Sequence, residues 1–182
     1  MFKKDLQQLL EEFRTHEEYK EQIVHWHEIT ATEAKTVPFP NGLNSNLVKA
    51  LQNRGMQSLY IHQGEAYQNI QDKNHIVTVT PTASGKTLCY NLPVLQEITE
   101  NEESRALYLF PTKALAQDQM SEVNELIAEM GIPIKSYTYD GDTPPNIRQA
   151  VRKAGHIVIT NPDMLHSAIL PHHTKWISFL RN

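Results

Sequence analysis

Four short segments rich in β-branched residues alternate with segments of helical periodicity after residue 74. These segments are nearly unbroken apolar runs, which is typical of strands buried on both faces of a sheet. Strands separated by helices favour a parallel sheet, because parallel neighbours need a crossover connection. The chain is therefore predicted to form an α/β domain whose parallel sheet is covered by helices on both faces. The expected strands are residues 75–80, 105–110, 132–139 and 156–160.

The first part of the chain has a different pattern. Its apolar side chains recur at the spacing of one helix face: Phe2, Leu6, Leu9, Leu10 and Phe13. This amphipathic helix packs either on the same domain or on other parts of a longer protein. Two prolines and a glycine in residues 36–42 predict a linker, because they disfavour helix and central strand. We expect a helical appendage over residues 1–35 and one main domain over 36–182.

Helix boundaries in the main domain follow from capping residues. Ser45 is expected to cap a helix that ends near Arg54, and Gly55 follows it. Arg148, Arg152 and Lys153 would share one helix, as a solvated face or as a contact to phosphate. Two further helices are expected over about residues 62–71 and 147–153. Another begins at about Lys86, a long one ends near Met130, and a short one begins at about Asp163.

Composition limits the class of protein. No apolar run approaches the roughly 20 residues that a membrane-spanning helix needs, so we expect a cytoplasmic protein without a membrane partner. The single cysteine, Cys89, excludes an internal disulfide, and the histidine spacing does not favour a zinc site. The net charge is −4 overall and −1 over residues 36–182, so strong non-specific binding of nucleic acid is not expected.

The turn TPTASGKT follows the first expected strand and opens a helix. Backbone N–H groups in such a turn form a positive concavity that holds a triphosphate. Gly85 lets the backbone approach phosphate, Lys86 is expected to reach the β and γ oxygens, and the Thr87 hydroxyl to bind Mg²⁺. A solvated turn is the alternative, but it leaves the strand-to-helix position unexplained. The expected ATP-binding residues are Thr80, Pro81, Thr82, Ala83, Ser84, Gly85, Lys86 and Thr87, of which Lys86 and Thr87 are also catalytic.

Thr80 stands where the strict phosphate-loop pattern has its first glycine, and this form of the turn resembles that of the superfamily 2 helicases of the DEAD/DEAH group. The resemblance implies a RecA-like domain that binds ATP and Mg²⁺. Upstream, the block LYIHQGEA resembles the Q-motif region of that group, in which a glutamine reads adenine. The resemblance gives this role to Gln63, whose amide has the donor and the acceptor that the adenine edge requires.

Three further blocks resemble motifs of the same group, and each follows an expected strand. PTKALAQDQ is similar to motif Ia, which grips the nucleic-acid backbone, and YDGDTP and ITNPDML correspond to the glycine-bearing motif and motif Ib. Open α/β sheets bind ligands at the carboxyl ends of their strands. Singly, these residues suit ordinary turns and helix caps, but together they favour a track for nucleic acid. The track is expected to include Pro111, Thr112, Lys113, Gly141, Asp142, Thr160, Asn161, Pro162 and Asp163.

The wording of these blocks is most similar to the bacterial mitomycin-repair helicases of the MrfA and YprA type, over about residues 36–182. The resemblance implies an ATP-dependent DNA-repair helicase that binds single-stranded DNA or a tailed duplex and closes against a second RecA-like domain. In that family a DExH sequence on a further strand completes the hydrolytic site. None occurs in these 182 residues, so we expect them to bind ATP without turnover. A nucleotide-dependent translocase or switch that separates no strands is the alternative, and a small-molecule kinase is disfavoured.

Overall fold

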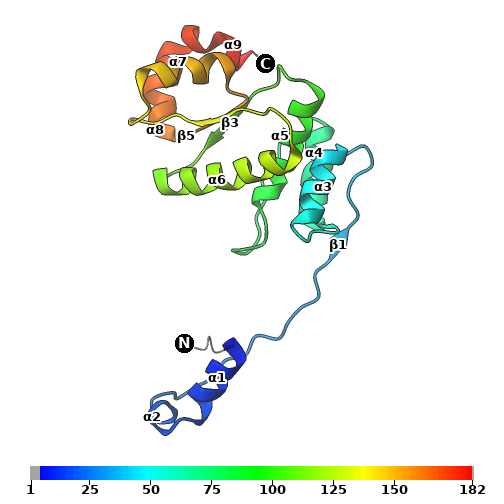
Figure 1. The fold of residues 1–182 in the computed structure, drawn as a ribbon, viewed down its shortest axis with the longest axis vertical. Coiled ribbons are helices and arrows are strands. Elements are labelled where there is room, and N and C mark those ends of the chain that lie inside the picture. Colours follow the sequence, from blue (N-terminus) through cyan, green and yellow to red (C-terminus); the bar gives the residue numbers. More distant parts are fainter. Residues whose placement is uncertain (1–4, 182) are drawn as a thin grey trace. The chain divides into compact units, whose positions relative to one another are not determined.

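The computed structural model describes residues 5–181, which belong to two compact units. The first unit ends at Ala34, and the second begins at Lys35 (Figure 1). The second unit contains every described strand and all the residues of the expected site. Its architecture therefore decides how those residues meet.

The described part of the first unit, residues 5–34, contains two short helices and an irregular segment. Helix α1 (Leu6–Thr15) begins with a capping box at Asp5, and α2 (Glu17–Lys20) follows it. The predicted amphipathic helix is confirmed from Leu6 onward, while Phe2 lies outside the described residues. Leu6 remains 66% exposed, so much of the apolar face has no cover within this unit.

The second unit starts with a strand where a linker was expected. Strand β1 (Thr36–Val37) pairs antiparallel with β2 (Leu59–Tyr60), so residues 36 and 37 of the expected linker are in fact ordered by a partner. The prediction failed there because the partner strand lies more than twenty positions away. A Cβ at Gly64 would lie 2.6 Å from the Val37 side chain, so glycine allows β1 to approach the helix behind it.

Two helices follow these strands. Helix α3 (Ser45–Asn53) is capped by Asn44, whose side chain accepts hydrogen bonds from two backbone amides of the first turn. The predicted cap at Ser45 was therefore wrong by one residue. Helix α4 (Ile61–Gln71) begins directly after β2 and packs along α5, which carries the far side of the phosphate-binding turn.

The main sheet has three parallel strands in the order β3-β5-β4. The strands are β3 (Ala106–Leu109), β4 (Ser136–Thr138) and β5 (Ile157–Thr160). Leu109 pairs with Thr160, and Thr138 pairs with Ile159, so all three strands end at the same edge. The predicted parallel α/β sheet is confirmed, and the three loops that follow the strands lie side by side.

Residues 75–80, expected as the first strand, pair with no other strand in the part of the chain that the structure describes. Val77 and Val79 are 90% and 88% exposed. The β-branched composition favours extended backbone, but a strand forms only where a neighbour supplies hydrogen bonds. Among residues 5–181, β5 is already flanked by β3 and β4, and β3 makes its ladder with β5 alone.

Helices cover both faces of this sheet (Figure 1). On β5, Ile157 and Ile159 pack into the larger core with α3, α5 and α6, while Val158 points to the opposite face. There it packs with Val151 of α7 and with Trp176. The helices after α4 are α5 (Thr87–Glu100), α6 (Lys113–Met130), α7 (Pro145–Ala154), α8 (Pro162–Met164), the π-helix η1 (Leu165–Ile169), the 3₁₀ segment η2 (Leu170–Trp176) and α9 (Ile177–Leu180).

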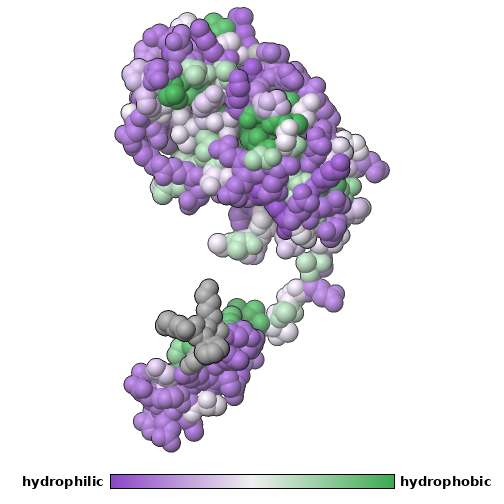
Figure 2. Space-filling model, viewed as in Figure 1, coloured by the Kyte–Doolittle hydropathy of each residue, from purple (hydrophilic) through white to green (hydrophobic). Residues whose placement is uncertain are grey.

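Figure 2 shows one face on which hydrophilic residues predominate and hydrophobic ones gather in small areas. Within residues 5–181, every helix is too short or too polar to cross a membrane.

Candidate nucleotide site and strand-end loops

The phosphate-binding turn links the extended residues 75–80 to the start of α5 at Thr87. Two of its residues have left-handed backbone, Ala83 with φ 59° and Gly85 with φ 75°. A Cβ at Gly85 would lie 2.6 Å from the Gln63 side-chain nitrogen, so a larger residue here would be strained by its backbone and would displace the Gln63 amide. Pro81, Thr82 and Ala83 form the exposed outer part of the turn.

The Lys86 ammonium is folded back into the turn. Its Nζ donates to the carbonyl oxygens of Thr80, at 2.8 Å, and Pro81, at 2.7 Å. The Thr80 and Ser84 hydroxyls, which hydrogen-bond each other, lie within 3.5 Å of the same nitrogen. All four partners are neutral oxygens, so the positive charge is solvated by the turn and is not cancelled by a carboxylate.

Helix α4 braces the turn from its other side. His62 Nε2 donates to the Ser84 carbonyl oxygen, and Gln63 Nε2 donates to the Gly85 carbonyl oxygen, both at 2.9 Å. The Gln63 side-chain oxygen accepts from the Tyr60 amide at 2.9 Å. Gln63 is 4% exposed, so the residue expected to read adenine is here part of the loop's support. One amide hydrogen and one oxygen lone pair of Gln63 are left over from these bonds.

The loops after β3 and β5 are closed by helix caps. The Thr112 hydroxyl accepts from the Leu115 amide at 3.2 Å, and Asn161 Oδ1 accepts from the Met164 amide at 2.8 Å. Pro162 and Asp163 form the exposed first turn after Asn161. The interpretation of Thr112 as an ordinary helix cap is therefore confirmed for α6. Helix α8 is capped by Asn161 and not by Asp163.

Lys113 and Asp142 join the loop after β3 to the loop after β4. Lys113 Nζ lies 2.6 Å from Asp142 Oδ2, and both side chains are exposed. The hydrogen bond, and then the attraction between the charges, raises the pKa of Lys113 and lowers the pKa of Asp142. A phosphate group that approached Lys113 would have to compete with this carboxylate.

Thr160 does not lie on an accessible track. Its side chain is 2% exposed, and its hydroxyl donates to the Tyr139 carbonyl oxygen at 2.6 Å. The expectation that Thr160 contacts nucleic acid is therefore corrected, because the central position of β5 buries its last residue. The hydroxyl instead ties the end of β5 to the end of β4.

Two residues, His62 and Arg148, have supporting roles that the sequence did not predict. The Arg148 guanidinium donates to the carbonyl oxygens of Thr143, Asp140 and Gly141, at 2.8, 3.1 and 3.2 Å. It also lies 5.3 Å from the centre of the Tyr139 ring. Arg148 thus supports the glycine-bearing loop, and its guanidinium is directed to that loop and not simply to solvent. For His62 the available signal was its position next to Gln63.

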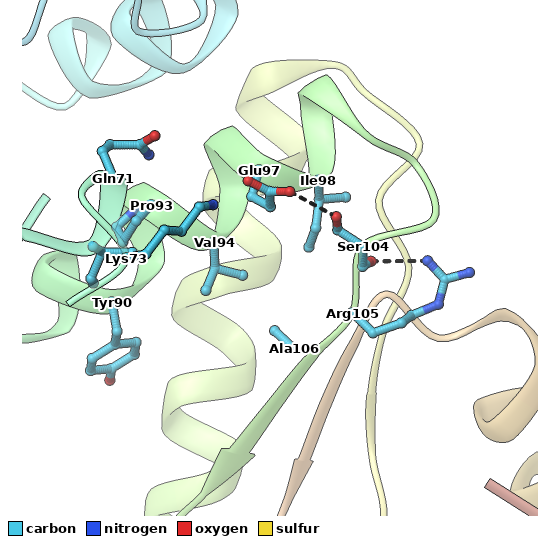
Figure 3. A pocket seen from close by; sticks show the side chains of 11 residues that line it. Gln71, Lys73, Tyr90, Pro93, Val94, Glu97, Ile98, Ser104, Arg105 and Ala106 are labelled. Atoms are coloured by element: carbon cyan, nitrogen blue, oxygen red, sulfur yellow. Dashed lines mark hydrogen bonds between the residues drawn. The ribbon is translucent and has the colours of Figure 1, made fainter. Parts of the chain in front are cut away.

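A cavity of about 270 Å³ lies at the other end of β3, between the end of α4 and α5 (Figure 3). Its lining is mainly apolar, with Tyr90, Val94 and Ala106 among its residues. Glu97 accepts a hydrogen bond from Ser104 at the rim. Because Ala106 begins β3, this cavity is separate from the strand-end loops.

Comparison with known proteins identifies the family. The sequence model described as DEAD/DEAH box helicase matches residues 60–181. The chain belongs to the DEAD/DEAH box helicases. The matched residues begin at Tyr60, include Gln63, the phosphate-binding turn and the three strand-end loops, and end at Arg181.

Particular relatives narrow the similarity. The chain is 64% identical, over its whole length, to the uncharacterized ATP-dependent helicase YprA of Bacillus subtilis, of which it covers 24%. It is 36% identical over 97% of its length to the ATP-dependent helicase hrq1 of Schizosaccharomyces pombe, covering 17% of that protein. The crystal structure of the helicase MrfA bound to DNA and AMPPNP matches with a TM-score of 0.86 and 64% identity, over 98% of this chain and 25% of that one. The chain thus spans about a quarter or less of the length of these relatives.

Proposed function

We propose that this chain is the ATP-binding part of an ATP-dependent DNA helicase that acts in DNA repair in the cytoplasm. The observation that carries the proposal is the position of Lys86, whose charge sits inside a left-handed, glycine-containing turn with neutral partners only. A triphosphate offers anionic oxygens in place of these carbonyls, and charge-assisted hydrogen bonds are about twice as strong as neutral ones. The membership in the DEAD/DEAH family and the AMPPNP bound to MrfA support ATP as the ligand.

The chain's own residues fit a magnesium nucleotide. Thr87 begins α5 directly after Lys86, so its hydroxyl is a hard oxygen ligand beside the proposed phosphate position. Bound Mg²⁺ would neutralise charge on the phosphate oxygens. The free hydrogen and lone pair of Gln63 are those that would meet the adenine edge.

The DNA partner is proposed to run over the strand-end loops. Lys113, Gly141 and Asp142 are exposed at the edge where β3, β4 and β5 end, as are Pro111, Thr112, Pro162 and Asp163. Amides at the start of α6, beside Lys113, suit a phosphate backbone. Single-stranded DNA or a tailed duplex is the proposed substrate, and a second RecA-like domain is the proposed partner that closes on the nucleotide. The DNA bound to MrfA supports this assignment.

Replacing Lys86 by alanine tests the proposal. We expect the affinity for a fluorescent, non-hydrolysable ATP analogue to fall about a hundredfold or more, because the loss removes the one cation inside the turn. The matched control is Lys153→Ala, which removes an exposed lysine of α7 and should leave the affinity unchanged. Circular dichroism should show that both variants remain folded. Equal affinities of the wild type and Lys86→Ala would reject the nucleotide site.

A further inference from the structure

We propose that His62 is a positioning residue for the phosphate-binding turn, and this inference rests on the proposed nucleotide site. His62 holds the Ser84 carbonyl at 2.9 Å across a separation of 22 residues. Its neighbour Gln63 holds the next carbonyl, that of Gly85, at the same distance. Two consecutive peptide groups of the turn are therefore attached to two consecutive residues of one helix.

These two bonds decide which way the amides of the turn point. Each peptide group is planar, and the peptide bonds of the turn are all trans, so the N–H points opposite to the C=O of the same group. The Ser84 carbonyl points to His62, and the amide of Gly85 therefore points away from α4. The Gly85 carbonyl points to Gln63, and the amide of Lys86 points away in the same manner. Backbone N–H groups aimed together into open space are what a phosphate site requires.

The His62 ring is itself oriented by its surroundings. The Tyr60 ring stacks on it, with centroids 5.7 Å apart and an interplanar angle of 11°. Because a carbonyl oxygen can only accept, Nε2 must carry the hydrogen in this contact. Gln63, which binds the Gly85 carbonyl, is also fixed by β2, because its side-chain oxygen accepts a hydrogen bond from the Tyr60 amide.

His62 and Gln63 should therefore affect different parts of the nucleotide. Gln63 is proposed to contact the base as well as the turn, whereas His62 is proposed to act through its hydrogen bond to the Ser84 carbonyl. Loss of the His62 donor leaves the base contact in place and loosens the amide of Gly85. The expected signature is weaker binding of the triphosphate with unchanged binding of adenosine and an unchanged preference for ATP over GTP.

Two substitutions separate the hydrogen bond from the packing of the ring. His62→Phe keeps an aromatic ring against Tyr60 but has no donor, and His62→Gln removes the ring but places an amide donor near the same carbonyl. Loss of one hydrogen bond to the turn predicts that His62→Phe binds a non-hydrolysable ATP analogue about tenfold more weakly. His62→Gln should bind it within about threefold of the wild type. The control is His166→Ala, an exposed histidine of η1.

The measurement is the equilibrium affinity of the protein for the ATP analogue, with adenosine and GTP as competitors and thermal unfolding as the check on folding. Wild-type affinity in His62→Phe would overturn the inference, and so would a variant His62→Gln that is as weak as His62→Phe. A parallel loss of adenosine binding would also overturn it, because that result indicates general disorder of the site. If the wild type binds no ATP analogue, the proposed function itself fails. If the wild type and His62→Phe bind the analogue equally well and Lys86→Ala does not bind it, only the role of His62 is rejected.

Discussion

The phosphate-binding turn and the strand-end loops both connect an extended segment to a helix, but they are held in different ways. The turn is supported from outside, because α4 supplies donors for the carbonyls of Ser84 and Gly85. Its cation, Lys86, contacts neutral oxygens alone. The turn is therefore organised by another element, and its charge remains available to an anion.

The strand-end loops are largely self-contained. Thr112 and Asn161 cap the helices that follow them, and Arg148 binds the carbonyls of the loop that precedes its own helix. The exposed cation of this edge, Lys113, is paired with Asp142. A phosphate arriving here must displace a carboxylate, whereas a phosphate at the turn replaces carbonyl oxygens. This difference predicts tight binding of a nucleotide's phosphates at the turn. At the loops it predicts weak binding of nucleic acid that falls as the salt concentration rises.

Among the residues that support the turn and the loops, Gln63 should have the largest effect when it is removed. Gln63→Ala leaves the Tyr60 amide and the Gly85 carbonyl without their side-chain partner in a part-buried place, which costs about 1–3 kcal/mol of the free energy of unfolding. We expect the affinity for ATP to fall about tenfold or more, and the preference for ATP over GTP to narrow. Calorimetric unfolding and nucleotide competition measure the two effects.

Gln68→Ala is the matched control for this substitution, since Gln68 lies on the same helix and is exposed. Lower stability with unchanged nucleotide preference would reject the contact between Gln63 and adenine while keeping its role as a brace. Unchanged stability and unchanged affinity would reject both roles.

Neutralising Asp142 should have a smaller effect, and it should increase binding at the strand-end loops. Asp142→Asn frees Lys113 for a phosphate, so the affinity for a labelled single-stranded oligonucleotide should rise about three- to fivefold at low salt. The slope of log affinity against log salt should become steeper by about 0.7, the value for one additional phosphate contact on a single strand. A fluorescence anisotropy titration at several salt concentrations measures both quantities.

Asp163→Asn provides the comparison for general charge, because Asp163 is an exposed carboxylate of the neighbouring loop. An equal gain in both variants would show that net charge, and not release of Lys113, improves binding. In a Lys113→Gln background the gain from Asp142→Asn should largely disappear.

The smallest effect is expected at Thr160, and on stability alone. Thr160→Val removes the hydrogen bond to the Tyr139 carbonyl and should lower the free energy of unfolding by about 1 kcal/mol. Binding of the oligonucleotide should stay within about twofold, since this side chain is buried. Thermal unfolding and anisotropy test the two parts, with Thr174→Val as the exposed control. A large loss of oligonucleotide binding in a stable variant would show that Thr160 contributes to the DNA contact after all.

The sequence by itself determined the features that depend on neighbouring residues. The apolar run of β5 forms a buried strand, Gly131 ends α6 in left-handed conformation, and the turn before α5 is bent at Gly85. In each case the pattern and its structural consequence lie in one short segment. The family resemblance likewise lies in short continuous segments, such as TPTASGKT and ITNPDML.

Tertiary structure alone decided which of these segments acquired partners. Residues 75–80 have strand composition without a paired neighbour among the described residues, and Thr160 lost its exposure because β5 is central. Lys113 meets Asp142 across 29 positions, and His62 meets Ser84 across 22. Burial and side-chain pairing depend on residues that only the fold brings together, so no local pattern contains them.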